Sequence, residues 1–101
     1  MTGTYIQLQG NGDEIRRVHA ALDEIRAEFW KARKKHKPMH SAHEAYAVIL
    51  EELDEAWDEI KRDDVPAARK EMVQVAAMAL AFLVEIAPAP TQQQPEEEEA
   101  R

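Results

Sequence analysis

Acidic and amide side chains recur at helical spacing in two neighbouring segments of this chain. Glu51, Glu52 and Glu55 are three or four residues apart, so a helix would place them on one face, one turn apart. Glu71 and Gln74 repeat the three-residue spacing beside an almost wholly apolar segment. A helix so apolar is expected to be buried, and a buried carboxylate needs a partner. Hard divalent cations such as Mg²⁺ are bound by oxygen ligands of this kind, so the pattern indicates a metal site.

Two structural roles without a metal also fit these carboxylates. Glu-rich helices commonly form a solvated charged face, and a carboxylate near a helix start is an ordinary partner of the helix dipole. A zinc site is not expected, because His40 and His43 flank a predicted helix start and no third ligand has suitable spacing. Together with His36, they are expected to contact solvent or phosphate.

Basic side chains gather in a single short segment of an otherwise acidic chain. The 101 residues carry a formal net charge of −7, whereas residues 31–37 contain Lys31, Arg33, Lys34, Lys35 and Lys37. Such a chain is a poor general binder of DNA. It suits a site in which a cation and a few basic groups share one polyphosphate, although cations also favour the end of a helix.

Three helices are needed to position these groups. After Asn11-Gly12, a turn signal, Asp13 is expected to cap a first helix that stops near Lys37, because Pro38 follows. Its apolar residues lie at spacings of three and four, which is typical of a one-sided amphipathic helix. They are Ile15, Val18, Leu22, Ile25 and Phe29.

Ser41 and Glu44 form a capping box, which predicts a second helix from about Ala42 to Arg62. Its apolar stripe is expected to contain Tyr46, Ile49, Leu53, Ala56 or Trp57, and Ile60. After a turn at residues 63–66, a third helix is expected at residues 67–87, apolar on nearly all sides and central in a bundle.

The chain is thus expected to be all-α, with a lead-in at residues 1–12, a helical domain at 13–87 and a disordered acidic tail at 88–101. Three helices leave apolar surface uncovered, so a homodimer or homotetramer that completes a bundle is expected. The absence of cysteine fits a cytoplasmic protein, and no apolar stretch reaches the length of a membrane span.

The two acidic segments carry a family resemblance. The pattern E-E-x-x-E at residues 51–55, followed on the next helix by Glu71 and Gln74, resembles the MazG-like all-α nucleoside triphosphate pyrophosphohydrolases over roughly residues 25–86. Trp30 with the lysine-rich segment and the apolar third helix extend the likeness. The resemblance implies hydrolysis between the α- and β-phosphates of a (deoxy)nucleoside triphosphate, which gives a monophosphate and pyrophosphate. Some small members act on purine deoxynucleotides such as dGTP, so we favour such a substrate here.

The resemblance also assigns roles to residues. It implies that Glu52, Glu55 and Glu71 bind Mg²⁺ or Mn²⁺, and that Glu51 is a further ligand or orients the attacking water. Gln74 occupies a position where the family usually has Asp; its amide can bind a cation but brings no charge. Phosphate contacts are expected from Lys34, Lys35, Lys37 and Lys70, and base contacts from Trp30 and Tyr46. The alternative function is a non-catalytic helical oligomer that serves as an assembly or regulatory module.

Overall fold

The computed structural model describes residues 11–90, which form helices joined by short turns. The elements, in chain order, are α2 (Gly12–Lys35), α3 (Ala42–Lys61), α4 (Val65–Ala81) and the π-helix η1 (Phe82–Ile86). No strand occurs between residues 11 and 90, so the predicted all-α class is confirmed. The predicted lead-in and tail lie mostly outside the described residues.

Polar side chains cap the first two helices. The cap of α2 is Asn11, whose side chain accepts a hydrogen bond of 2.8 Å from the Glu14 N–H. The prediction that Asp13 caps this helix is wrong. Asp13 lies inside the first turn, where its charge complements the helix dipole. Ser41 caps α3 as predicted and accepts a bond of 3.1 Å from the Glu44 N–H.

The connection between α3 and α4 is a tight turn around Asp63. Asp63 has a φ of 59°, a left-handed conformation that few residues other than glycine adopt. The side chain of the next residue, Asp64, accepts from the Ala67 N–H at 3.1 Å and thereby caps α4. Because this cap precedes Pro66 in the first turn, α4 begins at Val65, two residues earlier than expected.

The last turn of the third predicted helix is not α-helical. α4 ends at Ala81, and residues 82–86 form the π-helix η1. The Ala87 N–H donates to the Phe82 carbonyl, five residues back, at 3.1 Å. Turns of this kind occur singly in α-helices and are frequent at functional sites.

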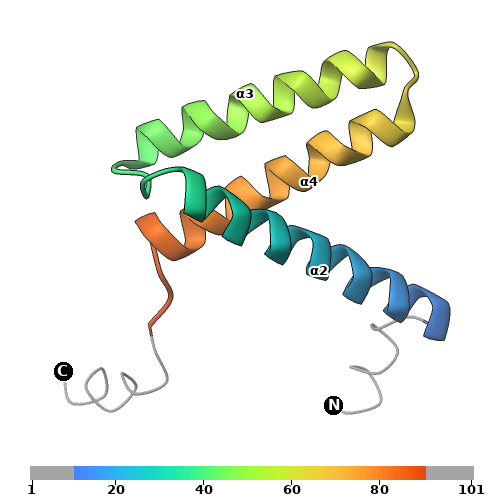
Figure 1. Cartoon of the computed structure of the whole chain (residues 1–101), viewed down its shortest axis with the longest axis horizontal. Coiled ribbons are helices and arrows are strands. Elements are labelled where there is room, and N and C mark those ends of the chain that lie inside the picture. The colour runs from blue at the N-terminus through green and yellow to red at the C-terminus, as the bar shows by residue number, and fades with distance from the viewer. Residues whose placement is uncertain (1–10, 91–101) are drawn as a thin grey trace.

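The three helices form an open bundle with α4 at its centre. Figure 1 shows α3 and α4 as an antiparallel hairpin and α2 lying across α4. α2 packs on α4 and makes no comparable contact with α3 in residues 11–90. The core is small: Phe29 of α2 is buried against Ala77 and Ala81 of α4. The buried residues of α3 are also alanines, Ala45 and Ala56, and their small side chains let the backbones of α3 and α4 approach closely.

The apolar stripe expected for the second helix faces α4 only in part, since Ala56 is buried and Ile49 is partly buried. Tyr46, Leu53 and Trp57 are 65%, 43% and 54% exposed. The fully buried residues of α3 are the alanines Ala45 and Ala56, whereas several of its larger apolar side chains are left exposed. In α2, Val18 and Leu22 are likewise about half exposed. No helix of residues 11–90 is long and apolar enough to cross a membrane.

Candidate metal centre and adjoining groove

The α3–α4 hairpin brings carboxylates from two helices to one level. Glu55 is eight residues before Asp63 and Glu71 is eight residues after it, so an antiparallel hairpin sets them opposite each other. Glu52 and Gln74 are each eleven residues from the same turn and therefore lie one helical turn further along. The three-residue spacing in both helices thus becomes two facing pairs.

Three of these side chains converge closely. Glu52, Glu55 and Glu71 each offer a carboxylate oxygen, and the three oxygens lie within 4.8 Å of one another. Oxygens that share one Mg²⁺ lie about 2.0–2.1 Å from it, and so at most about 4 Å apart. The separations in the cluster are close to that range. The donor set therefore fits a hard divalent cation.

The electrostatics of the cluster point in the same direction. Burial, followed by the charges of Glu55 and Glu71, raises the pKa of Glu52 above its ordinary value. Burial and the charge of Glu55, with a smaller contribution from Glu59, raise the pKa of Glu71 in the same sense. Three carboxylates packed this closely repel one another, and a divalent cation among them would remove that repulsion.

A groove of about 580 Å³ opens beside the cluster. Its acidic wall contains Glu51 and Glu52 of α3 and Gln74 of α4. Glu52 is therefore the residue common to the three-carboxylate cluster and the groove. Glu55 and Glu71 lie in the cluster but do not line the groove, and Glu51 lines the groove without joining the cluster.

The opposite wall of the groove is basic. It comes from the last turns of α2 and from the segment that leads to α3. Lys35 and Lys37, which are expected phosphate contacts, both line it. The wall also contains Lys31, Arg33 and His36, together with one carboxylate, that of Glu28. A ligand in the groove would thus have carboxylates on one side and several cations on the other, which suits a metal-chelated polyanion.

Four of the residues expected to contact phosphate or base do not line this groove. Lys34 and Lys70 are exposed outside it. Trp30 is 56% exposed and packs edge-on against the Phe29 ring, with the ring centroids 5.1 Å apart. Tyr46 belongs to the exposed face of α3. The groove therefore offers no aromatic platform for a base within the described part of the chain.

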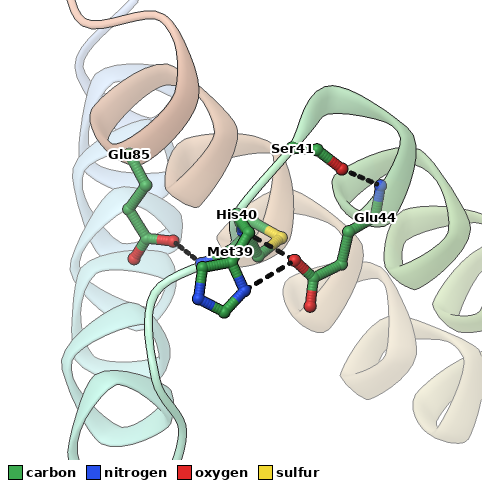
Figure 2. A network of polar contacts seen from close by, with 5 residues as sticks. All are labelled: Met39, His40, Ser41, Glu44 and Glu85. Atoms are coloured by element: carbon green, nitrogen blue, oxygen red, sulfur yellow. Dashed lines mark hydrogen bonds and ion pairs between the residues drawn. The ribbon is translucent and has the colours of Figure 1, made fainter.

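Three acidic groove residues, Glu28, Glu44 and Glu85, were not predicted as site residues from the sequence. Glu85 of η1 and Glu44 of α3 both line the groove, and each accepts a backbone hydrogen bond from the segment between α2 and α3 (Figure 2). Glu85 could have been noticed because it interrupts an apolar segment, where a carboxylate requires a partner. Glu44 was assigned only its capping role.

The comparisons with known proteins give no family for this chain. Neither the models of known protein families, nor the curated proteins, nor the solved structures contain a significant match. The acidic motif and the geometry of residues 11–90 are therefore the features that indicate a function.

Proposed function

We propose that this chain is a MazG-like, metal-dependent (deoxy)nucleoside triphosphate diphosphohydrolase. The observation that carries the proposal is the convergence of Glu52, Glu55 and Glu71 within 4.8 Å beside a groove whose far wall is basic. The acidic wall of the groove suits metal cations, and the basic wall suits phosphate groups. A nucleoside triphosphate chelated to a divalent cation presents both partners at once.

The proposed metal ligands are Glu52, Glu55 and Glu71, with Gln74 one helical turn from Glu71 on the groove side. Bound Mg²⁺ or Mn²⁺ would supply charge neutralisation and Lewis-acid polarisation of the phosphate oxygens. Gln74 can offer a neutral amide oxygen to this centre, or hold a water molecule by hydrogen bonding. Three anionic ligands remain even without an Asp at this position.

The residues of the chain divide the reaction between the two walls. Glu51 lines the groove next to the cluster, where its carboxylate can orient a water molecule for in-line attack on the α-phosphorus. Lys35 and Lys37 face it from the basic wall and offset the charge that develops on departing pyrophosphate. Fixing both the attacking water and the leaving group in one groove is the main contribution of the protein.

The substrate class follows from the phosphate chain more than from the base. No aromatic side chain of the described residues lines the groove. The preference for a purine deoxynucleotide such as dGTP therefore rests on the family resemblance, and we propose it on that basis alone.

Assembly of two or four copies is part of the proposal. Val18 and Leu22 of α2 and Leu50, Leu53 and Trp57 of α3 are each at least 40% exposed. Exposed apolar residues in such number, repeated along helix faces, are typical of surfaces covered by another protein. A second copy could cover them and complete a helical bundle.

The decisive experiment is incubation with a panel of NTPs and dNTPs plus Mg²⁺ or Mn²⁺, with products separated by chromatography. We expect monophosphate and pyrophosphate in equal amounts. Reaction in water enriched in the heavy oxygen isotope should label the monophosphate, since attack is on the α-phosphorus. Orthophosphate as the first product would contradict the proposal.

Variants locate the activity in the cluster. Glu52→Gln and Glu55→Gln should each abolish pyrophosphate release while the protein remains folded and assembled. Asp58→Asn is the matched control, because Asp58 lies on the same helix and pairs only with Lys61 at its surface. If the wild type releases no pyrophosphate from any nucleotide and its melting is unaffected by Mn²⁺, the non-catalytic assembly or regulatory module is the better account.

A further inference from the structure

Glu85 is a largely enclosed carboxylate of the groove. Its side chain is 8% exposed, although it belongs to the π-helix η1 near the end of the described residues. One oxygen accepts the Met39 N–H at 3.0 Å, and the other lies 3.3 Å from Nη1 of Arg33. Glu85 therefore joins three separate parts of the chain: η1, the last turns of α2, and the segment that follows α2.

Arg33 is restrained more than any other cation of the basic wall. Its guanidinium carbon lies 5.5 Å from the centre of the Phe29 ring, which is itself buried in the core. The guanidinium thus contacts both that ring and Glu85, and its side chain is 35% exposed. Within residues 11–90, Lys35 and Lys37 form no ion pair or contact with an aromatic ring, unlike Arg33. A guanidinium has five N–H donors, so several remain for a ligand in the groove.

The segment between α2 and α3 is held from both sides. Successive backbone N–H groups donate to carboxylates of different helices: Met39 to Glu85 and His40 to Glu44, the latter at 2.6 Å (Figure 2). Figure 2 places the two carboxylates on either side of the segment. Lys37 lies two residues before Met39, so this anchoring also limits where the Lys37 backbone can lie.

We propose that Glu85 is a positioning residue for phosphate binding: it holds the Arg33 guanidinium and the Met39 segment so that the basic wall presents oriented donors to a polyphosphate. Because the charge of Glu85 offsets that of Arg33, Arg33 mainly provides oriented N–H donors for the polyphosphate, whereas the lysines provide net positive charge. This inference rests on the proposed function for its ligand, a polyphosphate. It assigns no contact between Glu85 and the substrate.

The test compares Glu85→Gln with wild type in two measurements. The amide oxygen of Gln can still accept the Met39 N–H, but the charge that holds Arg33 is lost. We expect KM for the best dNTP to rise about tenfold, as for a weakened charge-assisted contact, with kcat within about twofold. Binding of inorganic tripolyphosphate, measured by calorimetry, should weaken by a similar factor. Arg33→Lys keeps the charge but not the planar donors, and it should show the same rise in KM and the same weakening of tripolyphosphate binding.

Glu24→Gln is the matched control. Glu24 forms the other Arg–Glu pair between α2 and the C-terminal half of the chain, with two bonds of 2.7 Å to Arg69, and neither residue lines the groove. It should leave KM and tripolyphosphate binding unchanged. Unchanged KM and tripolyphosphate binding in both Glu85→Gln and Arg33→Lys would overturn the inference and reduce the contact to a structural tie.

The two proposals fail in different ways. A wild-type protein that binds tripolyphosphate, and loses that binding in Glu85→Gln, supports the positioning role even if no nucleotide is hydrolysed. A wild-type protein that does not bind tripolyphosphate rejects the positioning role outright. If Glu85→Gln does not fold, Arg33→Lys alone decides, since it leaves the Glu85 contact to Met39 in place.

Discussion

Glu55 and Glu71 face each other across the α3–α4 hairpin because each is eight residues from Asp63. The pairing needs only a tight turn and two helices of regular pitch, so it depends on local structure and not on the rest of the bundle. The carboxylate cluster is therefore expected to survive changes in α2 that alter the groove. Substitutions in the carboxylate cluster and substitutions in α2 should therefore have separable effects.

Divalent cations should stabilise the protein. Metal that binds only the folded state at about 100 times its Kd adds about 2.7 kcal/mol to the free energy of unfolding. We expect melting with Mn²⁺ and a nonhydrolysable dNTP to show an increase in Tm for wild type and for the control Asp58→Asn. Glu55→Gln should melt at the same temperature with and without the cation. An equal shift in Glu55→Gln would remove that residue from the metal centre.

The stability of the metal-free protein should fall as pH rises above the ordinary glutamate pKa. Burial and neighbouring carboxylates raise the pKa of Glu52 and Glu71 in the folded state, so between the ordinary and the raised values the folded chain binds more protons than the unfolded one. In that window the free energy of unfolding decreases with pH, and above it the penalty is complete.

Denaturant unfolding at several pH values checks this. Glu52→Gln should be more stable than wild type at neutral pH without metal, and the advantage should shrink as the pH is lowered through the window. Glu24 is the contrasting case: its hydrogen bond to Arg69 lowers its pKa, so its contribution is present above the ordinary value and is lost as pH falls. A pH-independent difference between Glu52→Gln and wild type would contradict the account.

Gln74→Asp should give equal or tighter metal binding, because a fourth carboxylate would then face Glu52 across the hairpin. The measurement is Mn²⁺ titration by calorimetry, compared with Gln74→Glu, which adds the same charge on a longer side chain. Weaker binding by Gln74→Asp would show that this position lies outside the metal shell.

Leu22→Glu should dissociate the assembly if α2 contributes to the interface between copies. Leu22 is 45% exposed and has no role in the groove, so its replacement should leave the monomer folded. Sedimentation velocity should show a shift to single chains, whereas Ala20→Glu, at an exposed position on another face of α2, should sediment as wild type. Equal sedimentation of Leu22→Glu and wild type would place the interface elsewhere.

Asp63→Ala should lower the free energy of unfolding by about 1 kcal/mol, because the left-handed conformation at φ 59° is disfavoured by a Cβ without a compensating polar group. Asp63→Gly should not lower it, since glycine adopts this conformation without strain. Urea denaturation of both variants makes the comparison. Equal losses would indicate that the Asp63 side chain, and not its backbone, matters.

Much of the secondary structure could be predicted because its signals are local. Ser41 with Glu44 marked the start of α3, and Pro38 marked where α2 had to stop. Which residues of α3 pack on α4 could be predicted only in part. Ala56 was one of the two residues expected at its position and is buried, whereas Tyr46 and Trp57 are exposed, because close approach of the backbones favours alanine at the contact.

The candidate site was predictable to the extent that it depends on spacing. Three-residue intervals and a short turn were enough to expect Glu52, Glu55 and Glu71 near one another. The π-helix has no comparable signal, so neither its wider turn nor the placement of Glu85 could be anticipated. The contacts of Glu85 with Arg33 and Met39 join residues far apart in the sequence, and local patterns do not specify such partners.

The small side chains at the crossing of α2 and α4 have a consequence for the reach of the site. The two walls belong to different elements, the hairpin and α2, and Phe29 of α2 is buried against Ala77 and Ala81 where they cross. A larger side chain at Ala77 or Ala81 would push α2 away from α4 at this crossing. The width of the groove between the acidic and the basic wall therefore depends on the small size of these two alanines.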